Sequence, residues 1–344
     1  MRRRIHRMTK TIKVVVYETH GNPAEVLQIK TEPWPSPAAG EAVVQMLAAP
    51  VNPADINAIE GKYPARREVP AVPGFEGAGV VTETGANVST TRKGEVVILP
   101  HNLGTWREAV AVKADDLVAV PPEIDPVSAA MLKINPMTAW RLLHDYVDLG
   151  RGDWVIQNAA NSAVGRAVIQ IARELGFKTV NVVRRPELID ELRGEGGDIV
   201  LVDGESPSRT GTLRDEVKAA TSGAPIRLGL NSVGGDSALQ LSNCLAFGGT
   251  LVSFGAMSLQ PLKIPTGLLI FKDLRFRGIW INHWYDNATM AERMAAFNPL
   301  FDMARRGLLK MKIEEAYSID DAKAAVSHAM QPKRSGKIIF EFKA

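Results

Sequence analysis

The chain has 344 residues, 45% of them hydrophobic and 23% charged, and a formal net charge of +3. This length suits about two domains, each able to build a full hydrophobic core. So small a net charge gives no reason to expect nucleic acid binding, and no apolar run is long enough to predict a membrane span.

The single cysteine, Cys244, excludes an intramolecular disulfide and favours a reducing compartment. We expect the cytoplasm, or the mitochondrial matrix if the source is eukaryotic. The first eight residues, Met1 to Met8, are basic, but no apolar segment follows them, so they do not predict a secretory signal.

The first third of the chain predicts a β-rich domain. Short apolar runs alternate with Gly and Pro, which mark turns. The strands that we expect lie at 12–17, 42–47, 78–83, 96–99 and 109–112.

From about residue 126 helices and strands alternate, which is typical of a mostly parallel sheet with helices on both faces. A helix is expected at 319–330, and a last strand at 337–340 returns to the β-rich domain. The fold class is therefore α/β with two domains, one formed by 1–125 with 307–344 and the other by 126–306. Further strands of the second domain are expected at 179–183, 198–202, 227–231, 250–254 and 274–281.

One passage predicts a strand–helix–strand unit that binds a dinucleotide. Val155 opens a short apolar run, and Asn161 and Ser162 are good N-cap residues for the periodic helix that follows. Gly176 ends this helix, and the β-branched run 179–183 favours a second strand. Such a unit places a pyrophosphate on a helix N-terminus, so the predicted contacts are Asn161, Ser162, Ala163 and Val164.

The glycine fingerprint of such units is incomplete here. In the G-x-G-x-x-G frame only Gly165 is present, and Ala160 and Ser162 take the other two glycine positions. The alternative is an ordinary βα turn of a parallel sheet.

Two arginines, Arg184 and Arg185, end the second strand, where an NAD site would have an acid that binds the ribose 2′-hydroxyl. Arginine suits a 2′-phosphate instead, because its guanidinium binds phosphate strongly. The sequence therefore predicts NADPH as the cofactor.

The segment Pro73-Gly74-Phe75-Glu76-Gly77-Ala78-Gly79-Val80-Val81 resembles the G-H-E-x-x-G-x-V segment of the medium-chain dehydrogenase/reductase family. The resemblance implies a GroES-like β-rich catalytic domain followed by a Rossmann cofactor domain. Phe75 stands where zinc-dependent members have a zinc-binding His, no cysteine lies upstream, and the six histidines are scattered. We therefore expect no metal.

The segment Asn52-Pro53-Ala54-Asp55-Ile56-Asn57-Ala58-Ile59-Glu60-Gly61-Lys62-Tyr63-Pro64 is similar to a segment of the mitochondrial-type 2-enoyl thioester reductases, a zinc-free branch of the family. The segments 157–165, 231–235 and 269–280 are similar to theirs as well. This resemblance implies NADPH-dependent reduction of the C2=C3 double bond of an enoyl-CoA or an enoyl-acyl-carrier-protein thioester in fatty acid metabolism.

The resemblance also implies site residues. Tyr63 matches the catalytic tyrosine and would donate a proton to Cα; the alternative is a tyrosine that packs on a turn. Asp55 and Glu76 are expected to be structural partners rather than acid–base groups. The residues that match cofactor-contacting positions are Asn135, Phe254, Gly255, Ala256, Met257, Ile279, Trp280, Ile281 and Lys337.

Two other functions stay open at this point. One is a zinc-free NADPH-dependent quinone or enone reductase on the same scaffold. The other is a catalytically idle NADPH-binding protein, against which Tyr63 argues. We also expect a homodimer, because the apolar run 274–281 has the pattern of an edge strand of the cofactor sheet.

Overall fold

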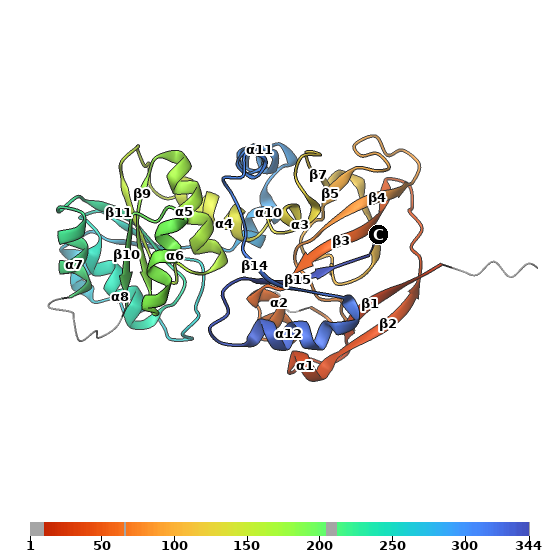
Figure 1. Cartoon of the computed structure of the whole chain (residues 1–344), viewed down its shortest axis with the longest axis horizontal. Coiled ribbons are helices and arrows are strands. Elements are labelled where there is room, and N and C mark those ends of the chain that lie inside the picture. The colour runs from red at the N-terminus through yellow and green to blue at the C-terminus, as the bar shows by residue number, and fades with distance from the viewer. Residues whose placement is uncertain (1–9, 65–66, 204–211, 344) are drawn as a thin grey trace, which may run out of the picture. The chain divides into compact units, whose positions relative to one another are not determined.

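A computed structural model describes residues 10–64, 67–203 and 212–343. The chain divides into two compact units, which we call the β-rich unit (10–133, 289–305 and 311–343) and the parallel-sheet unit (134–288 and 306–310). Figure 1 labels helices and strands of both units. The basic segment from Met1 to Met8 lies outside the described residues. No helix in the described parts of the chain is long and apolar enough to cross a membrane.

The β-rich unit contains a seven-stranded sheet in the order β14-β15-β3-β4-β5-β7, with β6 paired to β3, and a separate pair of strands, β1 and β2. Its strands are β1 (Thr11–Tyr17), β2 (Leu27–Pro33), β3 (Glu41–Pro50), β4 (Ala78–Thr84), β5 (Val96–Ile98), β6 (Ala109–Lys113), β7 (Val118–Ala119), β14 (Ile313–Tyr317) and β15 (Lys337–Glu341). Its helices are α1 (Pro23–Val26), α2 (Pro53–Ile59), α3 (Pro126–Ala130), α11 (Met290–Arg305) and α12 (Ala322–Met330).

The last strand of the chain joins this sheet beside β3, a strand from the first part of the chain, as the sequence predicts. In β15, Ile339 pairs antiparallel with Pro50 of β3. Ile338 and Phe340 are buried in the same core as strands β3 and β4, and the Phe340 ring lies 5.0 Å from that of Trp106. The C-terminal segment therefore completes the core of the β-rich unit.

The parallel-sheet unit has six parallel strands in the order β10-β9-β8-β11-β12-β13. They are β8 (Trp154–Gln157), β9 (Lys178–Val183), β10 (Ile199–Val202), β11 (Ile226–Asn231), β12 (Thr250–Ser253) and β13 (Arg275–Gly278). The helices are α4 (Asn135–His144), α5 (Ala163–Leu175), α6 (Ile189–Gly194), α7 (Leu213–Ala220), α8 (Gly235–Cys244), α9 (Thr266–Ile270) and α10 (Ile281–Asn287).

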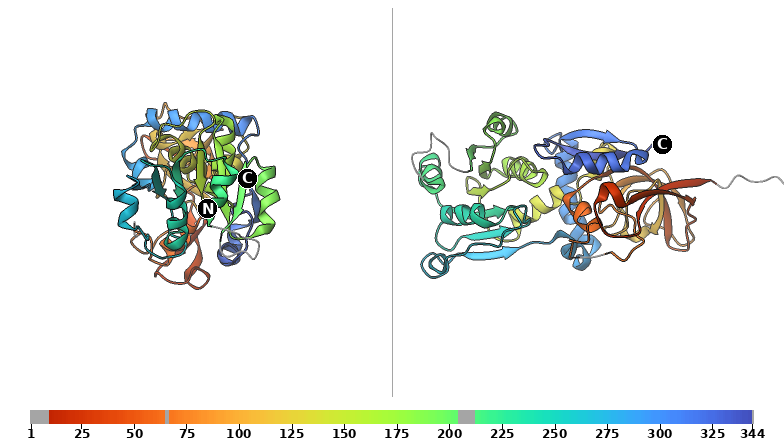
Figure 2. Two further views of the ribbon diagram at one scale, coloured as in Figure 1. Left: turned by 90° about the vertical axis from the view of Figure 1, so that its left-hand side faces the viewer. Right: turned by 90° about the horizontal axis from the view of Figure 1, so that it is seen from below.

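The strand order of this sheet reverses direction between β8 and β11. The chain runs outward from β8 to β10, returns beside β8, and then runs outward to β13. Because parallel crossovers are right-handed, the helices of the two halves cover opposite faces (Figure 2). This is the Rossmann arrangement, in which a ligand binds at the reversal, beyond the carboxyl ends of the strands.

Several elements differ from the prediction. Strand β13 ends at Gly278, and Ile281 begins helix α10 instead of ending the strand. Strands β2 and β14 were not predicted, because most of their side chains are exposed and no alternation of apolar residues marks them. Helix α2 was not predicted either, since only strands were expected in the first third of the chain.

The predicted domain boundaries need a correction. Residues 126–133 and helix α11 belong to the β-rich unit, and 307–310 belong to the parallel-sheet unit. Helix α11 buries Phe297, Leu300 and Phe301, and the charge of its Arg293 acts on the pKa of Lys133. Helical periodicity reveals an apolar face but not the core that this face joins, so sequence alone misplaced α11.

Candidate active site

In the β-rich unit, Tyr63 follows helix α2, and the helix end fixes its backbone. Gly61 adopts a φ of 74°, in the left-handed region that glycine reaches at low cost. The turn brings the amide groups of Lys62 and Tyr63 to the carbonyl oxygen of Asn57, at 2.8 and 3.1 Å. Tyr63 is half-buried, and its ring centroid lies 5.2 Å from that of Phe75.

Phe75 is buried, with 1% of its surface exposed. Its hydrocarbon ring cannot ligate a metal, although the corresponding residue of zinc-dependent enzymes does so. No group of three His, Cys, Asp or Glu side chains suited to a metal ion occurs among the described residues.

A buried polar network surrounds the start of α2. Asp55 accepts hydrogen bonds from the backbone amides of Asn52, at 2.8 Å, and Phe75, at 2.9 Å. The Asn52 amide donates to Glu76 at 2.8 Å and accepts a hydrogen bond from the Lys337 ammonium. Asp55 and Glu76 therefore act as structural partners, as expected from the sequence.

Burial changes the pKa values of the ionisable groups in this network. It raises the pKa of Asp55 to about 7 and lowers that of Lys337 to about 8. The pKa of Lys133, whose ammonium donates to the carbonyl oxygen of Leu99 at 2.8 Å, falls to about 7 for the same reason. A contact of Lys337 with a cofactor stays a prediction; within the β-rich unit its ammonium also donates to the carbonyl oxygen of Val51 at 3.4 Å.

In the parallel-sheet unit, the turn after β8 has the form that phosphate binding requires. Ser162 is the N-cap of α5, and its side-chain oxygen accepts a hydrogen bond from the backbone amide of Gly165 at 3.1 Å. A Cβ atom at position 165 would lie 2.5 Å from the carbonyl oxygen of Ala160, so only glycine lets the helix approach the strand so closely. The backbone N–H groups of the first turn of α5 suit an anion.

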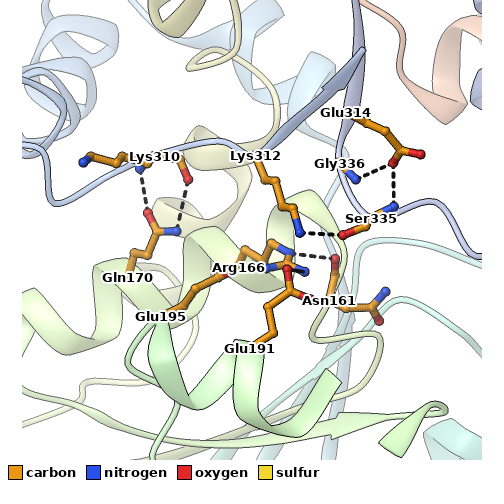
Figure 3. A network of polar contacts seen from close by, with 10 residues as sticks. All are labelled: Asn161, Arg166, Gln170, Glu191, Glu195, Lys310, Lys312, Glu314, Ser335 and Gly336. Carbon is orange, nitrogen blue, oxygen red and sulfur yellow. Dashed lines mark hydrogen bonds and ion pairs between the residues drawn. The ribbon is translucent and has the colours of Figure 1, made fainter. Parts of the chain in front are cut away.

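Arg166 supports this turn from the helix side, as Figure 3 shows. Arg166 is only 3% exposed, and its guanidinium donates to the carbonyl oxygen of Asn161 at 3.2 Å. It pairs with Glu191, at 3.1 Å, and with Glu195. Both glutamates belong to α6 and its C-cap, so this ion-pair cluster joins the turn after β8 to the helix after β9.

The two predicted 2′-phosphate contacts follow β9 directly. Arg184 is exposed, and Arg185 is half-buried with its guanidinium 3.7 Å from the carboxylate of Glu187. Positive charge therefore lies at the carboxyl end of β9, where an adenosine ribose is expected in this fold.

The remaining candidates of this unit lie at the ends of other elements. Asn135, 7% exposed, begins α4. The segments 254–257 and 279–281 follow β12 and β13, whose carboxyl ends are neighbours, and the amide of Ile279 donates to the carbonyl oxygen of Ser253 at 3.1 Å. Met257 and Trp280 are 63% and 41% exposed, which argues against simple core packing.

Buried amide side chains that were not predicted from the sequence hold these strand ends. Asn158 donates to Asn231 at 2.9 Å across the β8–β11 reversal, and Asn231 donates to Ser253 at 2.9 Å. Gln157 donates to Asn181 at 2.7 Å and to the carbonyl oxygen of Gly165 at 2.9 Å. Burying an amide side chain in an otherwise apolar strand costs free energy unless the amide forms hydrogen bonds. An Asn or Gln within or directly after an apolar run is therefore the sequence signal for these residues.

Comparison with known proteins adds to this geometry. The model of the alcohol dehydrogenase GroES-like domain matches residues 38–122, and that of the zinc-binding dehydrogenases matches residues 163–296. The mitochondrial enoyl-[acyl-carrier-protein] reductase of Xenopus tropicalis is 41% identical over 333 residues, covering 94% of each chain. The chain belongs to the enoyl-[acyl-carrier-protein] reductase family.

Solved structures of two kinds of reductase are also similar to this chain. The complex of Etr1p with NADP and crotonyl-CoA is 30% identical, with a TM-score of 0.88 over 97% of this chain and 100% of that one. A putative NADPH:quinone reductase from Bacillus thuringiensis is 29% identical, with a TM-score of 0.89 over 97% of this chain and 100% of that one. This enoyl reductase family member thus has the GroES-like and Rossmann domains of the medium-chain dehydrogenases/reductases.

Proposed function

We propose that this protein uses NADPH to reduce the C2=C3 double bond of trans-2-enoyl thioesters, with Tyr63 as the proton donor. The observation that carries the proposal is the 41% identity to an enoyl-[acyl-carrier-protein] reductase over nearly the whole of both chains. A second support is the likeness to a structure whose ligands are NADP and crotonyl-CoA.

The residues of the parallel-sheet unit fit NADPH. The N-terminus of α5 provides backbone donors for a pyrophosphate, and Arg184 and Arg185 provide charge for a 2′-phosphate. At Gly255 a Cβ atom would lie 2.6 Å from the Ser232 hydroxyl, so glycine lets the segment after β12 pack closely against the segment after β11. When bound, the cofactor supplies the hydride that adds to Cβ of the substrate.

Tyr63 would perform the second half of the reaction. As hydride adds to Cβ, negative charge develops on the thioester oxygen and on Cα. The Tyr63 phenol would stabilise this charge with a hydrogen bond and deliver its proton to Cα. No metal is needed for these steps, and Phe75 could not hold one.

A quinone or enone reductase is the second candidate, because a putative NADPH:quinone reductase has a comparable TM-score. The test is NADPH oxidation with crotonyl-CoA, a longer enoyl-CoA and a quinone, measured side by side. Crotonyl-CoA turnover at least tenfold more efficient than that of the quinone supports the proposal. The reverse order would establish the quinone reductase, and NADPH binding without any turnover would indicate an idle protein.

Independence from metal has its own test. Dialysis of the protein against a chelator is expected to leave crotonyl-CoA reduction unchanged, since no step of the proposed reaction uses a metal. Loss of activity that added Zn²⁺ restores would contradict the proposal.

We further propose that the protein is a homodimer whose substrate carrier is coenzyme A or an acyl carrier protein. The similar enzymes of Xenopus tropicalis and Homo sapiens are named as mitochondrial, and this supports the mitochondrial matrix as the location if the source is eukaryotic. The cytoplasm is the proposed location in a bacterium.

A further inference from the structure

The Tyr63 ring packs against the ring of Phe75. The centroids of Tyr63 and Phe75 lie 5.2 Å apart, and the ring planes are tilted by 49°. Phe75 is 1% exposed, whereas Tyr63 is half-buried, so Phe75 is the fixed partner of this pair. Aromatic pairs at this distance attract each other beyond the burial of their surface.

Arg67 holds the same ring. Its guanidinium carbon lies 4.8 Å from the Phe75 centroid, within the range of a cation–π contact. The guanidinium also donates to the carbonyl oxygens of Val72 and Gly74, the second at 3.3 Å. It therefore ties the segment just before Phe75 to the ring on which Tyr63 rests.

Both aromatic residues are also attached to helix α2. The amide of Tyr63 donates to the carbonyl oxygen of Asn57, near the end of the helix. The amide of Phe75 donates to the carboxylate of Asp55, in its first turn. One short helix thus anchors both backbones, and the ring contact restrains the Tyr63 side chain.

We propose that Phe75, supported by Arg67, is a positioning residue that holds the Tyr63 phenol where it protonates the substrate. The inference rests on the proposed role of Tyr63. A position that provides a metal ligand in zinc-dependent relatives thus serves here to aim a proton donor. Misplacement by about 1 Å can cost on the order of 100-fold in rate, so the loss of such a support has a measurable effect.

The test is a double-mutant cycle on crotonyl-CoA reduction with saturating NADPH. Phe75→Leu is expected to lower kcat about tenfold while the NADPH dissociation constant stays unchanged. In the Tyr63→Phe background the same substitution is expected to change the remaining rate less than twofold, because no phenol is left to position. A purely structural role would give the same loss in both backgrounds.

The control is Phe297→Leu, which removes the same atoms from a buried phenylalanine of α11 in the same unit. It is expected to lower the unfolding temperature as Phe75→Leu does, but not kcat. Should Phe75→Leu fail to fold, Arg67→Met removes the cation from the ring without opening a deep cavity, with a several-fold loss of kcat expected.

Equal kcat losses in Phe75→Leu and Phe297→Leu, or a full Phe75→Leu loss in the absence of the Tyr63 hydroxyl, would overturn the inference. Normal turnover by Tyr63→Phe would instead overturn the proposed role of Tyr63 itself, so the two failures are distinguishable.

Discussion

At the scale of single residues, the β-rich unit concentrates its chemistry around helix α2. Tyr63 is partly accessible at one end of the helix, while Asn52 and Asp55 lie buried at the other. The buried groups are satisfied by hydrogen bonds to each other and to backbone amides. This leaves the half-buried phenol as the residue that we expect to meet a substrate.

Tyr63→Phe is expected to lower kcat for crotonyl-CoA about 100-fold or more, the usual scale for losing a positioned acid. The ring and its contact with Phe75 remain, so the NADPH dissociation constant should change little. Steady-state kinetics and NADPH fluorescence titration check these two quantities. Tyr317→Phe, another half-buried tyrosine of the same unit, is the control and should retain full activity.

Arg184→Asp is expected to weaken NADPH binding about 10- to 100-fold, which corresponds to one lost charge-assisted hydrogen bond. NADH binding should stay equal or improve, because a carboxylate can accept a hydrogen bond from the ribose 2′-hydroxyl. Titration of both cofactors measures the change. Arg193→Asp, an exposed arginine of α6, is the control; an equal loss for NADPH and NADH in Arg184→Asp would refute the 2′-phosphate contact.

At the scale of elements, the ends of strands and helices hold the candidate residues in place. Buried amides join β8 to β9 and β11, and the ion pairs of Arg166 join α5 to α6. Only the short turn Pro186–Leu188 separates the two predicted 2′-phosphate arginines from α6, so this cluster links the two parts of the proposed phosphate site along the chain.

Arg166→Met is expected to destabilise the parallel-sheet unit by about 3 kcal/mol, since it leaves the glutamate side chains of α6 without their buried partner. NADPH affinity should fall as well, because the turn at Asn161 loses its support. Urea unfolding and cofactor titration test both effects. Arg173→Met, at an exposed arginine of the same helix, should change neither.

At the scale of the whole molecule, the parallel sheet leaves β13 at its edge. Among the described residues β13 pairs only with β12. Just before it, Leu269, Ile270 and Phe271 are 46%, 65% and 79% exposed, which is unusual for adjacent apolar side chains. An unpaired edge beside an apolar surface favours association with a second copy of the chain.

Sedimentation at micromolar concentration is expected to give twice the chain mass of 37.3 kDa. Phe271→Asp should shift the population toward the single chain, because it places a charge in the apolar contact. Met330→Asp, at a 46% exposed residue of α12, should leave the mass unchanged. A single-chain mass for the unmodified protein would contradict the proposed homodimer.

The sequence by itself determined the features that depend on neighbouring residues. The periodic helix after β8 and its Gly176 C-cap were predicted, and of the two predicted N-cap candidates, Asn161 and Ser162, the structure uses Ser162. The parallel sheet also followed from the alternation of elements. These features are local because caps and periods depend on residues a few positions apart.

Tertiary structure alone decided the partners that lie far apart in the chain. It assigned α11 to the β-rich unit, paired the Lys337 ammonium with Asn52, and placed Phe75 against Tyr63. A local sequence pattern does not predict which core an apolar helix face packs against, or which acceptor a buried charged group binds. These choices are made by the free energy of burying and satisfying groups together, and that depends on the whole fold.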